Sequence, residues 1–237
     1  TNTQNLPLNC GQAALASTVT LNNANFTFSG TGTGTLTFSA VNLQAGTIDA
    51  TGYAMTFSGA YNQSGGIFTG GSDTVTHSTY TLSSGTYTAT SGTTAISTTW
   101  THSGGTYNHG SGTFSSTGGS STITVVDQDI FYNATFSVTN SNTRTVTGGT
   151  LIIAHTFNFS NAGGGALAAT LELRGDITGS GSSFPGSRTI SLTGTADQVW
   201  SIPSGFSGTF TIDKSAGSVT QSTAITVGTF TFTNGTW

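Results

Sequence analysis

The sequence predicts an all-β fold in which the chain winds into a β-solenoid with short coils, each of about 20 residues. A pattern of large residues and glycines recurs with that period between residues 41 and 114. Strand-favouring Thr, Tyr, Phe, Val and Ile alternate with smaller residues. No segment has the 3.6-residue periodicity of an amphipathic helix. A fixed short period is typical of a repeat architecture, whereas a string of β-sandwich domains would repeat every ~100 residues.

Four copies of the repeat align without gaps, at residues 41–48, 61–68, 80–87 and 100–107. Each copy starts and ends with a large residue and turns at a glycine that follows Ser or Ala, because glycine adopts backbone angles that other residues avoid. The starting residues form one column and the ending residues a second. These columns are Val41, Tyr61, Tyr80 and Trp100, and Ile48, Phe68, Tyr87 and Tyr107.

A third column of apolar residues precedes the other two in each coil. Three columns predict three short strands per coil, each paired in parallel with the next coil at about 4.8 Å. With coils of this length, the whole chain would make about a dozen of them. The third column consists of Leu36, Met55, Val75 and Ile96.

The aromatic columns have two interpretations. Stacked large residues usually fill the interior of a solenoid, and the aliphatic Val41 belongs to the same column as Tyr61, so we expect the columns to point inward. If they point outward, they form an aromatic strip that could bind a ligand such as a glycan. The residues of this candidate binding or stacking strip are Tyr61, Tyr80, Trp100, Phe68, Tyr87 and Tyr107.

Composition excludes some classes of function. Charged residues make up 5% of the chain and the net charge is −4, which cannot supply the basic stripe that nucleic-acid binding needs. No run of about 18 apolar residues suggests a transmembrane segment. The abundance of Thr, Ser, Asn and Gly, with few charges, favours a secreted, cell-surface location. Cys10 is the single cysteine, so it is free or pairs with another chain.

The chain divides into segments of different regularity. Residues 1–17 lack the repeat and are expected to be a cap, a linker or a strand lent to a neighbouring subunit. Residues 18–237 are expected to form one continuous solenoid, with regular coils over 18–118. The Asp-Gln pairs at 127–128 and 197–198 suggest longer units at 119–188 and 189–237, the second cut short.

Two stretches, 195–235 and 99–114, resemble the Gly/Thr-rich repeats of very large bacterial surface and adhesin-like proteins. The shared features are turn and strand residues, such as the run Thr-Ile-Asp-Lys-Ser-Ala-Gly that ends at Gly217. The resemblance implies a right-handed β-helix-like stalk or filament outside the cell. It offers no catalytic residues.

Candidate chemical groups are few. Asp127 and Asp129 would share a face of a strand and could bind Ca²⁺ or act as an acid–base pair, although solvated turn carboxylates are the simpler expectation. Glu172 and Arg174 would form an exposed ion pair. Arg174 also opens an Arg-Gly-Asp tripeptide, which we attribute to a glycine corner. We therefore expect no catalytic residue, no cofactor and no metal.

Histidines give no shared ligand set in the repeat register, because His102 aligns with Leu82, His109 with Ala89, and His77 with Ser97.

A further alternative is ice binding through outward Thr-x-Thr arrays. Thr79 and Thr81 align with Thr99 and Thr101. The array breaks one coil earlier, at Ala60 and Asn62, and threonine ladders also stabilise sheets for structural reasons alone.

The sequence therefore favours a non-enzymatic structural subunit of an extracellular filament, with a glycan-binding adhesin or an ice-binding protein as alternatives. Open coils at the two ends would drive head-to-tail self-association, which yields filaments. We expect the joint to involve residues 1–17 and 229–237. The candidate assembly residues are Cys10, Phe230, Phe232 and Trp237.

Overall fold

A computed structural model describes residues 4–9, 14–31, 34–117, 119–139, 142–162, 166–181, 189–201 and 206–237. It confirms the predicted class: the described chain is all-β, without a helix, and winds into about 10 parallel coils roughly 20 residues apart. By its contacts, the chain forms two compact units, residues 1–115 and 116–237. The described residues contain no helix long and apolar enough to cross a membrane.

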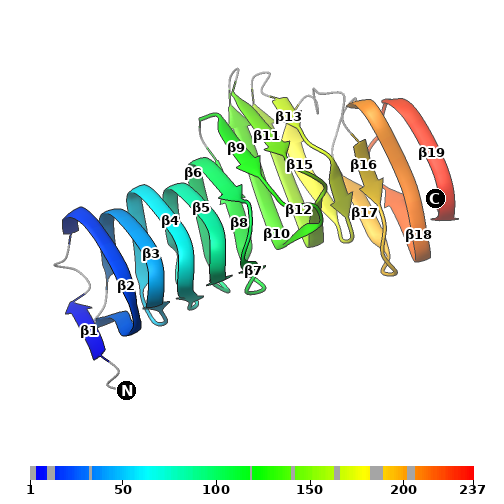
Figure 1. Ribbon diagram of the computed structural model, residues 1–237. Coiled ribbons are helices and arrows are strands. Elements are labelled where there is room, and N and C mark those ends of the chain that lie inside the picture. The colour runs from blue at the N-terminus through cyan, green and yellow to red at the C-terminus, as the bar shows by residue number, and fades with distance from the viewer. Residues whose placement is uncertain are drawn as a thin grey trace. The chain divides into compact units, whose positions relative to one another are not determined.

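The first unit stacks its strands in parallel, each on the corresponding strand of the previous coil, as the blue and cyan ribbons show (Figure 1). Its long strands bend around corners of the coil, so that one strand covers more than one side. The strands are β1 (Gln4–Asn9), β2 (Ala14–Thr31), β3 (Thr35–Ala50), β4 (Ala54–Gly70), β5 (Val75–Thr88), β6 (Thr93–His102) and β7 (Thr106–Asn108), followed by β8 (Thr113–Ser116) at the border of the units.

The first aromatic column is confirmed, and it points inward. Val41 pairs with Tyr61, Tyr61 with Tyr80, and Tyr80 with Trp100, and all four side chains are fully buried. The rings of Tyr80 and Trp100 stack with centroids 3.8 Å apart. Each inward residue therefore packs on its equivalent in the next coil, which is how a linear core replaces a globular one.

The second column is also confirmed, with Phe68 and Tyr87 stacked at 4.4 Å between centroids. The third column was wrong at one position. Val75 pairs with Thr94, 19 residues further on, and not with Ile96, 21 residues further on, because the extra residue of this coil comes only at the bulge after His77. Ile96 instead pairs with His77, so the expected alignment of His77 with Ser97 was wrong too.

Glycines form a column at one corner of the first unit. Gly85 has φ +85°, and a Cβ atom there would lie 2.5 Å from two carbonyl oxygens of the preceding coil. Only glycine satisfies both the backbone angle and the space. The column consists of Gly46, Gly66, Gly85 and Gly105.

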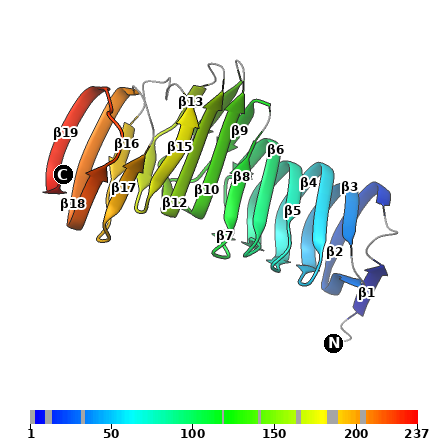
Figure 2. The same ribbon diagram turned by 180° about the vertical axis from the view of Figure 1, so that it is seen from behind.

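The second unit is built in the same way with less regular coils, as the view from behind shows (Figure 2). Its strands are β9 (Ser121–Thr124), β10 (Asp129–Thr139), β11 (Thr143–Thr147), β12 (Leu151–Ala162), β13 (Ala166–Ala168), β14 (Leu171–Leu173), β15 (Ile177–Gly181), β16 (Thr189–Leu192), β17 (Gln198–Ser201), β18 (Phe206–Gln221) and β19 (Val227–Thr236).

Single coils of unequal length account for the looser period of the second unit. Ala134 pairs with Phe157, and Phe157 pairs with Ile177, so the first of these two coils is longer than the second. The two Asp-Gln pairs are not equivalent, because Gln128 is exposed in a turn with φ 65° whereas Gln198 is buried. Longer coils also explain why the chain makes about 10 coils and not a dozen.

Candidate assembly surfaces

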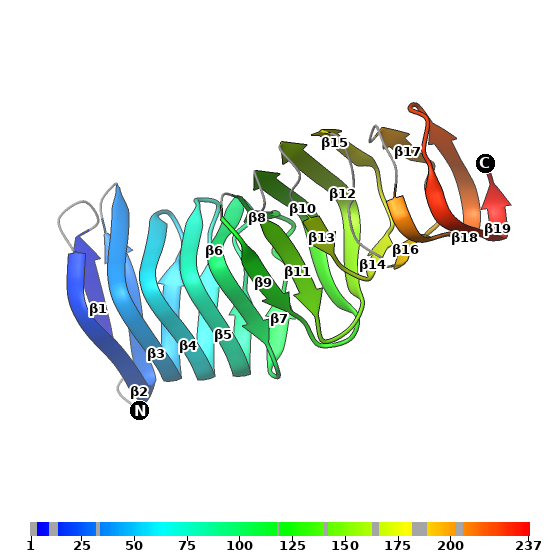
Figure 3. The same ribbon diagram turned by 90° about the horizontal axis from the view of Figure 1, so that it is seen from above.

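The last coil of the second unit leaves its inward-facing residues uncovered. Phe230 continues the column of the fully buried Phe210, and Phe232 continues that of the fully buried Ile212. Phe230 and Phe232 are each 48% exposed, because no further described coil packs on them. Figure 3 shows β19 as the outermost strand, next to β18.

Trp237 completes this C-terminal face. It is 46% exposed, and its ring lies 5.7 Å from that of Phe230 in an edge-on contact. The three rings border a hollow of about 340 Å³. The C-terminal face, as we call it, consists of Gln221, Ile225, Val227, Phe230, Phe232 and Trp237.

The first coil has a corresponding N-terminal face. β1 pairs with residues 26–31 of β2, while residues 15–23 of β2 pair with β3 on one side and with no described strand on the other. A hollow of about 310 Å³ lies over this part of β2. The N-terminal face consists of Val19, Thr20, Leu21, Asn22, Asn23, Phe26 and Phe28.

Neither face carries a charged residue. Both faces combine apolar side chains with the edge of a parallel strand. Such an edge can accept a further strand through main-chain hydrogen bonds. The N-terminal face was not predicted as a set of residues, although the alternation of Val19, Leu21, Phe26 and Phe28 was available. Cys10 lies outside the described residues.

The residues of the aromatic strip do not form an outer binding surface. Five of the six rings are fully buried and Tyr107 is part-buried, so the strip is an interior stack. A glycan cannot reach the five buried rings from solvent.

The interior also contains polar groups, several of them held by hydrogen bonds. The His77 ring replaces an aromatic residue in the column that contains Phe57, stacks on Phe57 at 4.8 Å, and contacts the Tyr87 hydroxyl through Nε2 at 2.9 Å. Burial lowers the pKa of His77 to about 3, so the ring is neutral at pH 7. Burial also raises the pKa of Tyr87 well above its usual value.

The carboxylates mainly accept hydrogen bonds from backbone amides at the corners of the coils. Asp127 is exposed and accepts a hydrogen bond from the Thr150 backbone at 3.0 Å, whereas Asp129 is buried and accepts one from the Val126 backbone. The expected shared face of Asp127 and Asp129 was therefore wrong. Asp197 accepts hydrogen bonds from the backbone and hydroxyl of Ser218, and these lower its pKa.

The Arg-Gly-Asp tripeptide is a glycine corner, as expected. A Cβ atom on Gly175 would overlap the His155 carbonyl oxygen, and Asp176 accepts a hydrogen bond from the Val199 backbone. Arg174 forms the predicted ion pair with Glu172, with 2.7 Å between Nε and Oε1.

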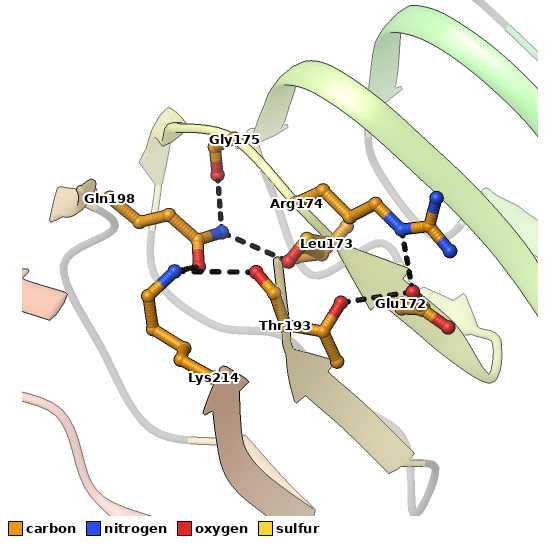
Figure 4. Close-up of polar contacts among 7 residues, drawn as sticks. All are labelled: Glu172, Leu173, Arg174, Gly175, Thr193, Gln198 and Lys214. Carbon is orange, nitrogen blue, oxygen red and sulfur yellow. Dashed lines mark hydrogen bonds and ion pairs between the residues drawn. The ribbon is translucent and has the colours of Figure 1, made fainter. Parts of the chain in front are cut away.

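Two buried cationic side chains donate hydrogen bonds to carbonyl oxygens inside the second unit. Lys214 donates to the Thr193 carbonyl at 3.3 Å and to Gln198 Oε1 at 2.7 Å (Figure 4). It also donates to the Ala196 carbonyl at 2.8 Å. Burial lowers the pKa of Lys214, and the Asp197 carboxylate opposes that shift. Arg144 similarly donates to the carbonyls of Ser116, Gly119 and Ser137.

Sequence reasoning missed both buried cations. The signal was present in the alternation, because Ile212 and Lys214 lie two residues apart and must share a face of the strand.

The threonine ranks stack as predicted, Thr79 on Thr99 and Thr81 on Thr101, and the previous coil presents Ala60 and Asn62 at these positions.

Among the described residues, no three His, Cys, Asp or Glu side chains gather as a metal site would require.

The fold defines the class of this protein, a parallel β-solenoid. Comparison with family models, curated proteins and solved structures finds no match.

Proposed function

We propose that this chain is a non-catalytic structural subunit of an extracellular filament or surface appendage, which assembles by stacking the C-terminal face of one copy on the N-terminal face of the next. The observation that carries the proposal is the half-exposed state of Phe230, Phe232 and Trp237, three large rings on the last coil. Elsewhere in the second unit, the same inward columns are covered by the next coil.

The physical reasons favour stacking of like units. Burying apolar side chains contributes about 25 cal/mol for each Å² removed from water, and a parallel edge gains main-chain hydrogen bonds at the same time. The uncharged faces add no repulsion between copies. The contact joins two different surfaces, so it does not close on itself and extends into a filament.

The extracellular location is supported by the near-absence of charge on a Thr- and Ser-rich skin, and by the resemblance to bacterial surface-protein repeats. The mechanism is mechanical, because main-chain ladders that continue across each joint give a stiff rod.

The test compares two variants of matched exposure. Replacing Phe230 and Phe232 together by Ser removes the rings of the C-terminal face, while Ile67→Ser removes an outward apolar residue that is 47% exposed on a side wall. By negative-stain electron microscopy at neutral pH, the unsubstituted chain and I67S are expected to form long uniform fibres. The double variant is expected to remain monomeric, with an unchanged circular dichroism spectrum.

Monomers of the unsubstituted chain at high concentration, or fibres from the double variant, would overturn stacking through these faces. Release of reducing ends from a polysaccharide would contradict the non-catalytic part of the proposal.

A further inference from the structure

Charge is concentrated in one part of this chain. The sequence has 4 Lys plus Arg and 8 Asp plus Glu, which makes 12 charged residues, and 7 of these 12 fall between residues 172 and 214. Elsewhere the outer skin is largely Thr, Ser and Asn. Of these seven, Lys214 is buried and Arg188 lies outside the described residues.

Three of these charged residues line a groove of about 530 Å³ on the outside of the second unit. The groove crosses successive coils, because Glu172 pairs with Ser191, Ser191 with Thr211, and Thr211 with Thr231. Its hydrogen-bonding residues include Glu172, Arg174, Thr193, Asp213, Ser215 and Asn234.

The guanidinium in this groove is held in place by its own neighbours. Glu172 Oε1 accepts hydrogen bonds from Arg174 Nε at 2.7 Å and from the Thr193 hydroxyl at 2.9 Å (Figure 4). Within the described part of the chain, the two terminal nitrogens of Arg174 donate to no residue, and the side chain is 41% exposed. Arg174 therefore presents an ordered donor pair, so little side-chain entropy is lost when a ligand binds.

Other groups along the groove are also unused. The carboxylate of Asp213 and the hydroxyl of Ser215 make no hydrogen bond to any described residue, and Asn234 uses only its Oδ1 atom, which accepts from the Gly235 backbone. The groove thus offers donors from Arg174 and Asn234, and acceptors from Asp213, over four successive coils.

We propose that this groove binds a neutral oligosaccharide. Sugar hydroxyls donate and accept at the same time, so they match alternating carboxylate, guanidinium, amide and hydroxyl groups. Two carboxylates against one guanidinium disfavour phosphates and polyanions, and a polar lining disfavours lipids. The volume lies within the usual range of ~300–1,000 Å³ for ligand sites. This site is separate from the interior aromatic stack.

The test uses saturation-transfer NMR with four neutral probes: the hexasaccharides of cellulose, chitin, laminarin and β-mannan. We expect at least one probe to be saturated by the intact chain. Asp213→Ala and Arg174→Ala are each expected to weaken the apparent affinity at least fivefold. Asp73→Ala removes an exposed carboxylate of the first unit and is expected to leave binding unchanged.

Absence of a signal from all four probes, or equal binding by D213A and R174A, would overturn the proposal. Binding of an anionic hexagalacturonate in preference to the neutral probes would overturn the assigned ligand class. Circular dichroism and the urea midpoint of each variant separate a lost contact from a lost fold. These outcomes are independent of fibre formation, because Arg174 and Asp213 belong to neither assembly face.

Discussion

At the scale of single residues, the solenoid depends on positions where one residue type fits. Gly85 is such a position, because it combines a left-handed backbone with close contact to the coil before it. Gly52 has nearly the same angle, φ +87°, but a Cβ atom there would meet no atom within 4 Å. The pair separates backbone strain from steric clash.

We predict that Gly85→Ala destabilises the first unit more than Gly52→Ala. Backbone strain alone costs about 1–2 kcal/mol for a non-glycine residue in the left-handed region, so G52A should lose about that amount. G85A should lose at least about 1 kcal/mol more, because Cβ would lie 2.5 Å from backbone oxygens and the ladder must shift. Urea unfolding measures both, and equal losses would show that the corner can relax.

His77 gives the first unit a specific response to acid. Its pKa is about 3 in the folded chain and about 6.5 when unfolded, so the unfolded state binds one more proton between those values. Stability is therefore present above pH 6.5 and falls by about 1.4 kcal/mol for each pH unit below it.

Replacing His77 by Phe should abolish this dependence between pH 6.5 and pH 4, since Phe also occupies the equivalent position 57. Urea midpoints at pH 7, 5 and 4 are the measurement, with the exposed His155→Ala as the control that should keep the dependence. A parallel fall in stability in H77F and the unsubstituted chain would assign the acid response to other groups.

At the scale of strands and coils, the alternation of side chains along each strand decides which of them point inward. Bulges decide which residues of successive coils pair with each other. The alternation was readable from the sequence: Val41 and Leu43 point inward, and both are fully buried. The bulge after His77 was not readable, because Thr94 and Ile96 are two residues apart and therefore lie on the same face of the strand. The third column therefore shifted from Ile96 to Thr94.

One of the candidate surfaces could be predicted from the sequence, and the other could not. Phe230, Phe232 and Trp237 were predicted from the sequence, since uncovered inward residues follow from the repeat itself. The polar groove was not, because its residues come from coils of different length, such as Arg174 and Asn234, which only the three-dimensional register brings together.

We predict that the buried Lys214 stabilises the second unit, since it satisfies two carbonyl oxygens and the Gln198 side chain at once. Lys214→Ala should cost about 3 kcal/mol, because these buried acceptors then lack a donor. Asp213→Ala changes the adjacent, outward residue and should alter stability by less than about 0.5 kcal/mol. Thermal and urea unfolding compare the two, and similar losses would mean that water replaces the ammonium.

At the scale of the whole molecule, the proposed stacking joins two different faces, so the expected assembly is directional. A copy with Phe230 and Phe232 replaced by Ser keeps its N-terminal face but has no working C-terminal face. It can add to the C-terminal end of a growing filament, and no further copy can then follow. It should therefore act as a cap.

We predict that this double variant shortens filaments of the unsubstituted chain when added at about one part in ten, far beyond the effect of dilution, because each incorporated cap stops one growing end. Filament length by electron microscopy is the measurement, and I67S at the same ratio should leave the length unchanged. If the contact joined two C-terminal faces, the variant could not bind at all, and adding it would not shorten the filaments. Length distributions that do not respond to the double variant would therefore exclude head-to-tail stacking, even if the unsubstituted chain assembles.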